Sequence, residues 1–387
     1  MDNQQKTYSV LLFEGRARQS LALSKAFKGL GCEVTALCES KLDVSYVSRY
    51  VDKKVIGVCN NANEVGTRDQ ILRLVKDNKY DLVVPTTDFA AMILSKYKKE
   101  IEQYSKVASN EWAIFQIAAD KNQTMKVCSN LELPCPVTLF DIDSIEKVKG
   151  IKYPIVVKPT IGYGAIGFHR VDSEEDLINL FKDSSDEEIK KYVFQEYIPQ
   201  TDLQYECAMF MDQNNQPKTA LVFSKNRWFP VEGGSSTLNI TVERPDIVES
   251  CTKLLQAINW RGAADIDLIQ DPRDGKAKIM EINPRVSGSV KIAFIAGTDQ
   301  AKQMLELAEN NHVTEFNDYE KGWRLRCFQT DFLWFLKSPE RFRAKPSWFS
   351  WKKTREQIFS WNDPIPWFAF TIKGLKNFRS EMNKRGQ

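Results

Sequence analysis

Histidine is nearly absent from this chain of 387 residues, which has only His169 and His312. Two histidines exclude a metal site built from several imidazole ligands. The eight cysteines are scattered, and no two of them form a CxxC pair. We therefore expect reduced, mostly buried thiols, because the spacing is typical neither of a zinc site nor of a disulfide scaffold.

Long apolar runs are also missing. No stretch reaches the roughly 18 to 20 apolar residues that a membrane-spanning helix needs, and the apolar run at residues 10–13 is too short for the core of a signal peptide. Neither sign of charge is in large excess, since 54 Lys+Arg against 51 Asp+Glu give a formal net charge of +3. These features predict a cytoplasmic protein that does not bind nucleic acid.

Two kinds of secondary-structure pattern divide the chain, whose length predicts two or three compact units. In the first hundred residues, buried strands at 8–13, 32–38 and 82–85 alternate with helical spacing, which is typical of a parallel α/β sheet. From residue 193 onward, strands of period two dominate and end in a hairpin over 264–270 and 276–282. This second pattern predicts antiparallel α+β structure.

The C-terminal end differs in composition from the rest. Residues 337–387 contain 12 Lys+Arg and 4 Asp+Glu, and six of the nine tryptophans lie beyond residue 320. Tryptophan mixed with basic residues suits a membrane interface. It equally suits tryptophans that pack a helical appendage onto the core, so both interpretations stay open.

A glycine-rich loop runs from Gly162 to Gly167 and fits the pattern GxGxxG. A strand-like stretch at 168–171 follows it, whereas a dinucleotide-binding loop opens a helix. Lys158 precedes the loop, whereas the lysine of a protein kinase follows its loop, and no GK[ST] ends the run as a P-loop requires. The pattern favours a hairpin whose N–H groups and Lys158 bind phosphate, with a simple glycine turn beside a solvated lysine as the alternative.

The last hairpin concentrates acidic residues. Period-two alternation places Glu281 and Asn283 on one face of one strand, and Asp265 and Asp267 on one face of its partner. Oxygen ligands of this kind suit Mg²⁺ shared with substrate phosphates, and Arg285 follows two residues later. A solvated charged hairpin is the alternative.

Taken in order, these pieces resemble the ATP-grasp superfamily, in particular its carboxylate-amine ligases of the carbamoyl-phosphate-synthase-like and D-aspartate-ligase-like branches. The resemblance covers residues 8–310 and rests on the Ala-Asp-Lys start of a helix at Lys121, Lys158, the glycine loop, the Gln-Glu-Tyr-Ile run at 195–198, and Asp267 with the EINPR hairpin. It implies a Rossmann-like domain at 1–110, a small subdomain with a glycine-rich lid at 111–192, a catalytic subdomain at 193–312 and a basic, Trp-rich extension at 313–387.

The resemblance also implies roles for single residues. Lys121 and Lys158 would contact the phosphates of ATP, and Gly162, Gly164 and Gly167 would form the lid. Glu196 and the backbone of Ile198 would meet the adenine, and Asp202, with Glu206 as a rival, would bind the ribose. Asp267, Glu281 and Asn283 would hold Mg²⁺, or Mn²⁺, expected as two ions. Arg285, with Lys158, would stabilise the phosphorylated intermediate.

A second segment resembles the acceptor side of the ligases. Lys225, Arg227, Gly233 and Gly234 lie in a stretch that resembles the R-x-x-P-x-x-GG pattern of that branch, and we expect it to line the substrate pocket with Ser287 and Gly288. Arg227 would pair with a substrate carboxylate through two hydrogen bonds. A structural turn is the alternative for this stretch.

The resemblance implies a ligase that activates a carboxylate as an acyl phosphate and couples it to an amine. The expected pair is an amino acid with another amino acid or with a sugar acid. A ligase that uses ammonia or a thiol, and a nucleotide-binding regulatory or scaffolding protein without turnover, are the alternatives. Expected partners are the two small substrates, with peripheral membrane contact through the extension and a homodimer as further possibilities.

Overall fold

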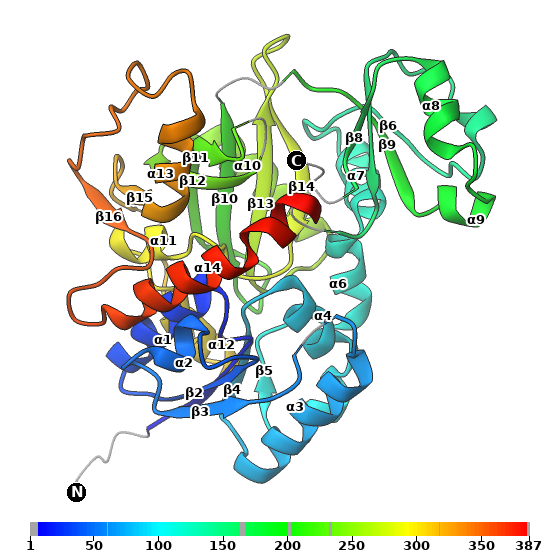
Figure 1. The fold of residues 1–387 in the computed structure, drawn as a ribbon. Coiled ribbons are helices and arrows are strands. Elements are labelled where there is room, and N and C mark those ends of the chain that lie inside the picture. The colour runs from blue at the N-terminus through cyan, green and yellow to red at the C-terminus, as the bar shows by residue number, and fades with distance from the viewer. Residues whose placement is uncertain are drawn as a thin grey trace, which may run out of the picture.

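The computed structural model describes residues 7–59, 61–162, 167–199, 203–231, 234–316 and 318–384. Its strands form sheets of five, seven and four strands, with helices packed around them (Figure 1). The five-stranded sheet is parallel and the four-stranded sheet is antiparallel. This arrangement confirms the predicted fold class, whereas the domain limits at residues 110, 192 and 312 stay predictions.

The N-terminal sheet has the order β3-β2-β1-β4-β5. Alternate residues of its central strand enter two different cores: Val10 packs with Phe27 of α1, and Leu11 packs with Ile71 of α3. Burial on both faces explains why the strand is continuously apolar. The elements are β1 (Ser9–Phe13), α1 (Arg18–Gly29), β2 (Glu33–Cys38), α2 (Val44–Val47), β3 (Lys53–Ile56), α3 (Glu64–Asn78), β4 (Leu82–Pro85), α4 (Asp88–Lys96), α5 (Lys98–Ile101) and β5 (Lys106–Val107).

A small sheet of the order β6-β9-β7-β8 follows helices α6 and α7, which connect it to the N-terminal sheet. Strands β7 and β8 pair antiparallel and flank the glycine loop, as the sequence predicts for a phosphate-binding hairpin. Val157, Leu177 and Phe194 belong to the core beneath it. The elements are α6 (Trp112–Ala119), α7 (Lys121–Asn130), β6 (Thr138–Leu139), a 3₁₀ turn (Ile145–Lys147), β7 (Ile155–Pro159), β8 (His169–Val171), α8 (Glu174–Phe181), α9 (Asp186–Ile189) and β9 (Tyr192–Glu196).

The large sheet has the order β14-β13-β10-β11-β12-β15-β16 and two unlike faces. One face is apolar, and its Cys207, Ile266 and Ile279 pack in a core with Leu254 of α10. The opposite face carries the charged residues described below. The elements are β10 (Gln204–Met211), β11 (Pro217–Phe229), β12 (Ser235–Val242), α10 (Pro245–Ala257), β13 (Gly262–Gln270), β14 (Ala277–Asn283), α11 (Lys291–Ile295) and α12 (Gln300–Ala308).

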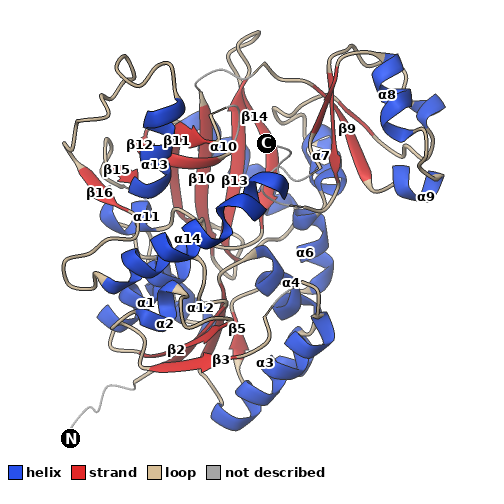
Figure 2. Cartoon of the chain, in the orientation of Figure 1, coloured by secondary structure: helices blue, strands red, loops and turns tan. Residues whose placement is uncertain are grey.

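The C-terminal extension continues this sheet and then crosses to the N-terminal domain. Strands β15 (Arg324–Arg326) and β16 (Thr354–Glu356) form its edge, next to α13 (Phe328–Lys337). Helix α14 (Ile365–Lys384) lies over α1 and α2, where Trp367 packs against Leu21 and Val44 (Figures 1 and 2). Over the described ranges, no helix is both long and apolar enough to cross a membrane.

Candidate active site

The register of β13 and β14 brings the acidic residues of the last hairpin together. Asp267 pairs with Glu281, and Asp265 pairs with Asn283. On the next strand, Glu206 of β10 pairs with Asp267. Because paired residues of neighbouring strands point to the same face, these side chains share the face opposite the apolar core.

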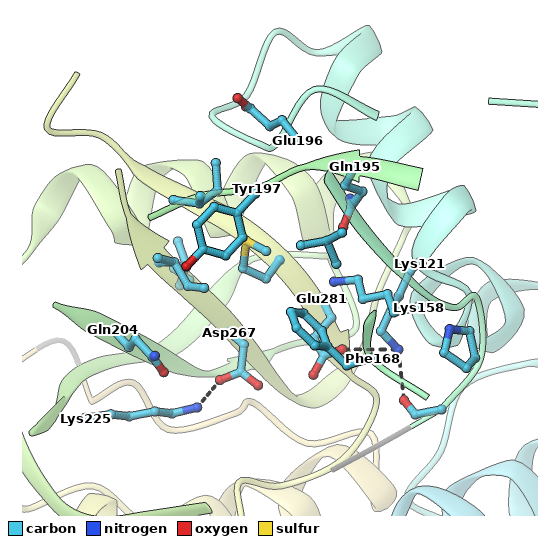
Figure 3. Close-up of a pocket in the computed structure, with 17 residues that line it drawn as sticks. Lys121, Lys158, Phe168, Gln195, Glu196, Tyr197, Gln204, Lys225, Asp267 and Glu281 are labelled. Atoms are coloured by element: carbon cyan, nitrogen blue, oxygen red, sulfur yellow. Dashed lines mark hydrogen bonds and ion pairs between the residues drawn. The ribbon is translucent and has the colours of Figure 1, made fainter. Parts of the chain in front are cut away.

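A cavity of about 230 Å³ lies between this face and the small sheet. Figure 3 shows the ammonium groups of Lys121, Lys158 and Lys225 around the carboxylates of Asp267 and Glu281. The cavity thus brings together eight residues that the sequence singles out, although they are up to 160 positions apart. They are Lys121, Lys158, Gly162, Glu196, Ile198, Lys225, Asp267 and Glu281.

Lys121 joins the two walls of the cavity. It is the first residue of α7, whose N-cap Asp120 accepts hydrogen bonds from the N–H groups of Asn122 and Gln123. Its Nζ lies 3.2 Å from Glu281 Oε2 and donates to the carbonyl of Gly162 at 2.9 Å. The capped helix start therefore holds one ammonium group between the base of the glycine loop and the acidic hairpin.

Lys225 neutralises carboxylate charge on the side of the cavity away from Lys121. Its Nζ contacts Asp267 and lies 3.1 Å from Glu206 Oε2. Burial works against its charge, but Asp267 and Glu206 outweigh burial and hold the pKa of Lys225 above its ordinary value. Glu206 also accepts a hydrogen bond from Ser287 Oγ, so Ser287 contacts the site through that carboxylate.

Arg285 is held in place by the N-terminal domain. Its Nε lies 3.0 Å from Asp88 Oδ1, and its Nη2 donates to Asp88 Oδ2 at 3.1 Å. Nη2 also lies 3.3 Å from Asn283 Oδ1. Asp88 begins α4, directly after the carboxyl end of β4, and sequence analysis missed it. One feature of the sequence could have indicated Asp88. Thr87 and Asp88 start a helix at the carboxyl end of a parallel strand, where α/β proteins bind ligands.

The carboxyl group of Asp265 has a shifted pKa. This residue is 2% exposed and lies on the same face of β13 as Asp267. Burial, followed by the neighbouring carboxylate of Glu206, raises its pKa well above the ordinary value. Arg285 Nη1 lies 3.9 Å away and opposes the shift. Arg285 thus lies between the carboxylates of Asp88 on α4 and Asp265 on β13.

The pKa of the cavity lysine Lys158 is lowered. Burial lowers it to about 8, Lys121 contributes in the same direction, and Glu281 and Asp267 oppose both. A lysine with this pKa is mostly charged at pH 7 and loses its proton near the pH of many enzyme assays.

We expect the affinity for Mg-ATP to fall as the pH rises above about 8, by up to about tenfold per pH unit, because ATP phosphates attract only the charged form of Lys158. Binding of a non-hydrolysable ATP analogue from pH 7.2 to 9.5 measures this. Lys158→Arg keeps its charge throughout, so its profile should be flat. An equally steep fall in Lys158→Arg would contradict the assignment.

Glu196 does not offer its side chain to the cavity. Its carboxylate lies 2.7 Å from Arg273 Nη2 and 2.9 Å from Lys278 Nζ, and it accepts from the N–H of Val137 at 3.0 Å. Figure 3 shows this side chain pointing away from the other residues. The expectation that the Glu196 side chain meets an adenine is therefore corrected, because Arg273 and Lys278 already neutralise its carboxylate.

Arg227 lies outside the cavity, which contradicts the prediction that it meets a substrate carboxylate. It is 3% exposed, its Nη1 lies 3.2 Å from Asp331 Oδ2, and its guanidinium lies over the ring of Trp334 at 4.6 Å. Asp331, which is 104 positions away, neutralises the charge that was expected to bind substrate.

The predicted glycines have different environments. Gly167 has a φ of +72°, and a Cβ there would lie 2.9 Å from Pro159 Cγ, so only glycine suits this end of the loop. Gly234 packs so closely on the carbonyl of Phe229 that a Cβ would clash, which supports the structural turn. Gly288 accepts a hydrogen bond from Gln357 of the extension at 2.8 Å. Gly164, Asp202 and Gly233 lie outside the described residues.

Asp267 and Glu281 offer two carboxylates at the cavity, and Asn283 lies beside them with its Nδ2 donating to Asp267 Oδ2 at 3.1 Å. Mg²⁺ prefers oxygen ligands and commonly binds one or two protein carboxylates together with substrate phosphates, so this donor set fits the ion. No group of three or more His, Cys, Asp or Glu side chains is arranged for a metal within the described part of the chain.

The family model for the ATP-binding domain of the carbamoyl-phosphate synthase L chain matches residues 120–316. The chain belongs to this ATP-grasp family. The match spans the linker helix of Lys121, the glycine loop and the whole acidic hairpin, so it confirms the resemblance that the sequence motifs indicated.

Relatives of this ATP-grasp protein include ligases and carboxylases. D-aspartate ligase of Enterococcus faecium is 23% identical over 290 residues, which cover 66% of this chain and 68% of that protein. The mitochondrial acetyl-CoA carboxylase of Saccharomyces cerevisiae is 23% identical over 251 residues, but these are only 11% of its length.

Solved structures share the fold. The biotin carboxylase domain of Hydrogenobacter thermophilus 2-oxoglutarate carboxylase, in complex with MgADP and bicarbonate, superposes with a TM-score of 0.68 at 16% identity, covering 83% of this chain and 74% of that one. L-amino acid ligase from Bacillus licheniformis superposes with a TM-score of 0.62 at 17% identity, covering 79% and 75%.

Proposed function

We propose that this protein is an ATP- and Mg²⁺-dependent ligase that forms an amide from a carboxylate and an amine. The observation that carries the proposal is the cavity itself. It gathers Lys121, Lys158 and Lys225 around Asp267 and Glu281, beside Gly162 and Phe168 and next to residues 196–198. Transfer of a phosphoryl group needs this combination of positive charge and positioning more than it needs a covalent nucleophile.

The chemistry has two steps. In the first, a carboxylate oxygen of the substrate attacks the γ-phosphorus of ATP, and the bond from that phosphorus to the oxygen of ADP breaks. In the second, the amine attacks the acyl carbon, phosphate leaves and the nitrogen loses a proton. Splitting the reaction in this way is required because a free carboxylate is a poor electrophile.

The residues of the chain would bind and orient the reactants. Lys121 and Lys158 would hold the phosphates, and the N–H groups of the glycine loop would cover them. Asp267, Glu281 and Asn283 would hold Mg²⁺, expected as two ions, which would neutralise phosphate charge when bound. Arg285, fixed by Asp88, would stabilise the negative charge of the acyl phosphate.

We propose an amino acid as one substrate, with a second amino acid or a sugar acid as the other. The relatives named D-aspartate ligase and L-amino acid ligase support this class. We further propose a cytoplasmic protein with peripheral membrane contact. A homodimer is proposed by analogy with the biotin carboxylase domain dimer of Hydrogenobacter thermophilus.

The test is release of ADP from Mg-ATP over a grid of carboxylic acids crossed with amines, with products identified by mass. We expect ADP only when one particular acid and one particular amine are both present, and a product with their summed mass minus water. ADP with the acid alone would indicate an acyl phosphate that awaits another nucleophile, such as ammonia or a thiol. A rise in melting temperature with Mg-ATP but no ADP from any pair would contradict the proposal and favour a binding protein without turnover.

A further inference from the structure

Large apolar side chains gather on the outside of the C-terminal extension. Nineteen such side chains are exposed in the part of the chain that the structure describes, and ten of these lie between residues 332 and 375. This stretch also holds six of the seven exposed phenylalanine and tryptophan side chains. Burial of apolar surface stabilises folding, so an exposed concentration of this size indicates a contact surface.

Five of the ten form a connected cluster around α13. Phe332 and Leu336 are one helical turn apart on α13 and are 42% and 54% exposed. Phe342 and Phe349 pack edge-on against the ring of Phe335, at 5.6 and 5.8 Å between ring centres, and are 71% and 62% exposed. Trp351, which is 51% exposed, joins them through the ring of Phe328.

The other five lie on and before α14. Ile365, Phe368, Ile372 and Leu375 recur at steps of three and four residues, which places them in one stripe along the helix. All four are exposed, and Trp361, just before the helix, is 88% exposed. The opposite side of α14 packs on the N-terminal domain through Trp367. The helix is therefore apolar on two sides, and only one side has a partner among the described residues.

A hydrogen bond links the two groups. Gln329 of α13 donates to Thr371 Oγ1 of α14 at 3.1 Å. Phe332 follows Gln329 by one helical turn, and Ile372 adjoins Thr371. The two helices are thus joined at this hydrogen bond, and we call the ten exposed apolar side chains on and around them the outer apolar surface.

Positive charge surrounds the outer apolar surface. Residues 337–376 contain nine Lys+Arg, of which Lys373 pairs with the buried Asp43, and three acids. Two of these acids are used inside the protein: Asp363 is 4% exposed and accepts from Ser48 Oγ, and Glu356 accepts from the N–H groups of Phe328 and Ile358. Glu340 is the remaining acid. The side chains that face water here are therefore mostly aromatic, aliphatic or basic.

We propose that the outer apolar surface docks on an anionic lipid bilayer. Aromatic rings and long basic side chains are the pair that a bilayer surface accepts, because the rings enter the headgroup region while the ammonium and guanidinium groups reach lipid phosphates. Protein interfaces are also rich in aromatic rings, so a second copy of the chain is the other occupant that the experiment below distinguishes from a bilayer. This surface lies outside the cavity and is independent of the proposed ligase reaction.

The test uses the full chain with vesicles of phosphatidylcholine containing 30% phosphatidylglycerol, and with vesicles of phosphatidylcholine alone. We expect co-sedimentation with the anionic vesicles at low salt. The affinity should be about tenfold or more weaker without phosphatidylglycerol, and it should fall when salt is raised, because Lys and Arg attraction to lipid phosphate is screened. Tryptophan emission should shift to shorter wavelength as exposed rings leave water.

Variants then separate the apolar contribution from the charge. Trp361→Ser with Ile372→Ser should weaken binding about tenfold, and Lys345→Glu with Lys352→Glu should weaken it on anionic vesicles only. Ile178→Ser on α8, which replaces a side chain that is 53% exposed, and Lys76→Glu on α3 are the matched controls. Neither control should change binding, and the melting temperature of every variant should stay within a few degrees of the parent.

Three results would overturn the proposal. These are no binding to anionic vesicles, binding that is equal with and without phosphatidylglycerol, and variants of the outer apolar surface that bind as tightly as the controls. Light scattering provides a further check, because a dimer that Trp361→Ser with Ile372→Ser converts to a monomer would assign the surface to a second copy of the chain. None of these readouts uses ADP formation. Their outcome is therefore independent of whether the ligase proposal is correct.

Discussion

Asparagine in place of Asp267, or glutamine in place of Glu281, is expected to slow ADP formation about 10²–10³-fold. Each change keeps the size of the side chain and removes one of the two charges that would hold Mg²⁺ against the phosphates. The side chains are 24% and 28% exposed and pair with lysines. Because partly exposed ion pairs contribute little stability, we expect both variants to stay folded.

The matched control for this experiment is Asp274→Asn in the turn of the same hairpin. The carboxylate of Asp274 is exposed, lies outside the cavity and accepts from the N–H of Lys276 at 2.9 Å. Its loss should leave ADP formation within about twofold of the parent, since surface substitutions of this kind have small effects. ADP release with the best substrate pair, followed beside a thermal melt, measures all three variants. Full turnover by Asp267→Asn and Glu281→Gln would contradict the site.

Asparagine in place of Asp331 is expected to lower the free energy of unfolding by about 3–5 kcal/mol. Asp331 is fully buried between two guanidinium groups, with Oδ2 3.2 Å from Arg227 Nη1 and 2.5 Å from Arg326 Nε. Thr237 Oγ1 donates to its other oxygen at 2.9 Å. Without this carboxylate, two buried positive charges have lost their common counter-ion.

Urea unfolding followed by tryptophan fluorescence measures this loss, because Arg227 and Arg326 lie over the rings of Trp334 and Trp348. The control is Asp318→Asn, whose side chain is 95% exposed beside Lys321 and whose loss should leave the free energy of unfolding nearly unchanged. Equal stabilities for the two variants would show that the buried charges find other compensation. Asp331→Leu combined with Arg227→Met and Arg326→Met should recover part of the loss, because it removes the unpaired charges.

Local patterns were sufficient for much of the site. Strand alternation placed Glu281 with Asn283 on one face of one strand and Asp265 with Asp267 on one face of its partner. The register of β13 and β14 then pairs Asp267 with Glu281 and Asp265 with Asn283. The strand-like residues after the glycine loop correctly indicated a hairpin instead of a dinucleotide fold. These inferences succeeded because the period of a strand and the position of a loop between strands depend on neighbours in sequence.

The sequence analysis failed mainly in predicting which groups pair with charged side chains. Sequence reasoning assigned Arg227 to a substrate and Glu196 to adenine, but their charges are neutralised by Asp331 and by Arg273 with Lys278. Asp88, which holds Arg285, was not considered at all. A carboxylate can form an ion pair with any nearby cation. Its partner therefore depends on which segments the fold brings within a few ångströms.

The amino-acid sequence was enough to indicate the strand and helix pattern, the position of the glycine loop between two strands, the acidic hairpin and membership of the ATP-grasp family. The tertiary structure alone decided that the N-terminal domain positions Arg285, that β15 and β16 extend the large sheet, and that one side of α14 is buried while the other faces water. Short-range periodicity records which face of an element is apolar. It does not record which distant element covers that face, because that depends on the free energy of packing the whole chain.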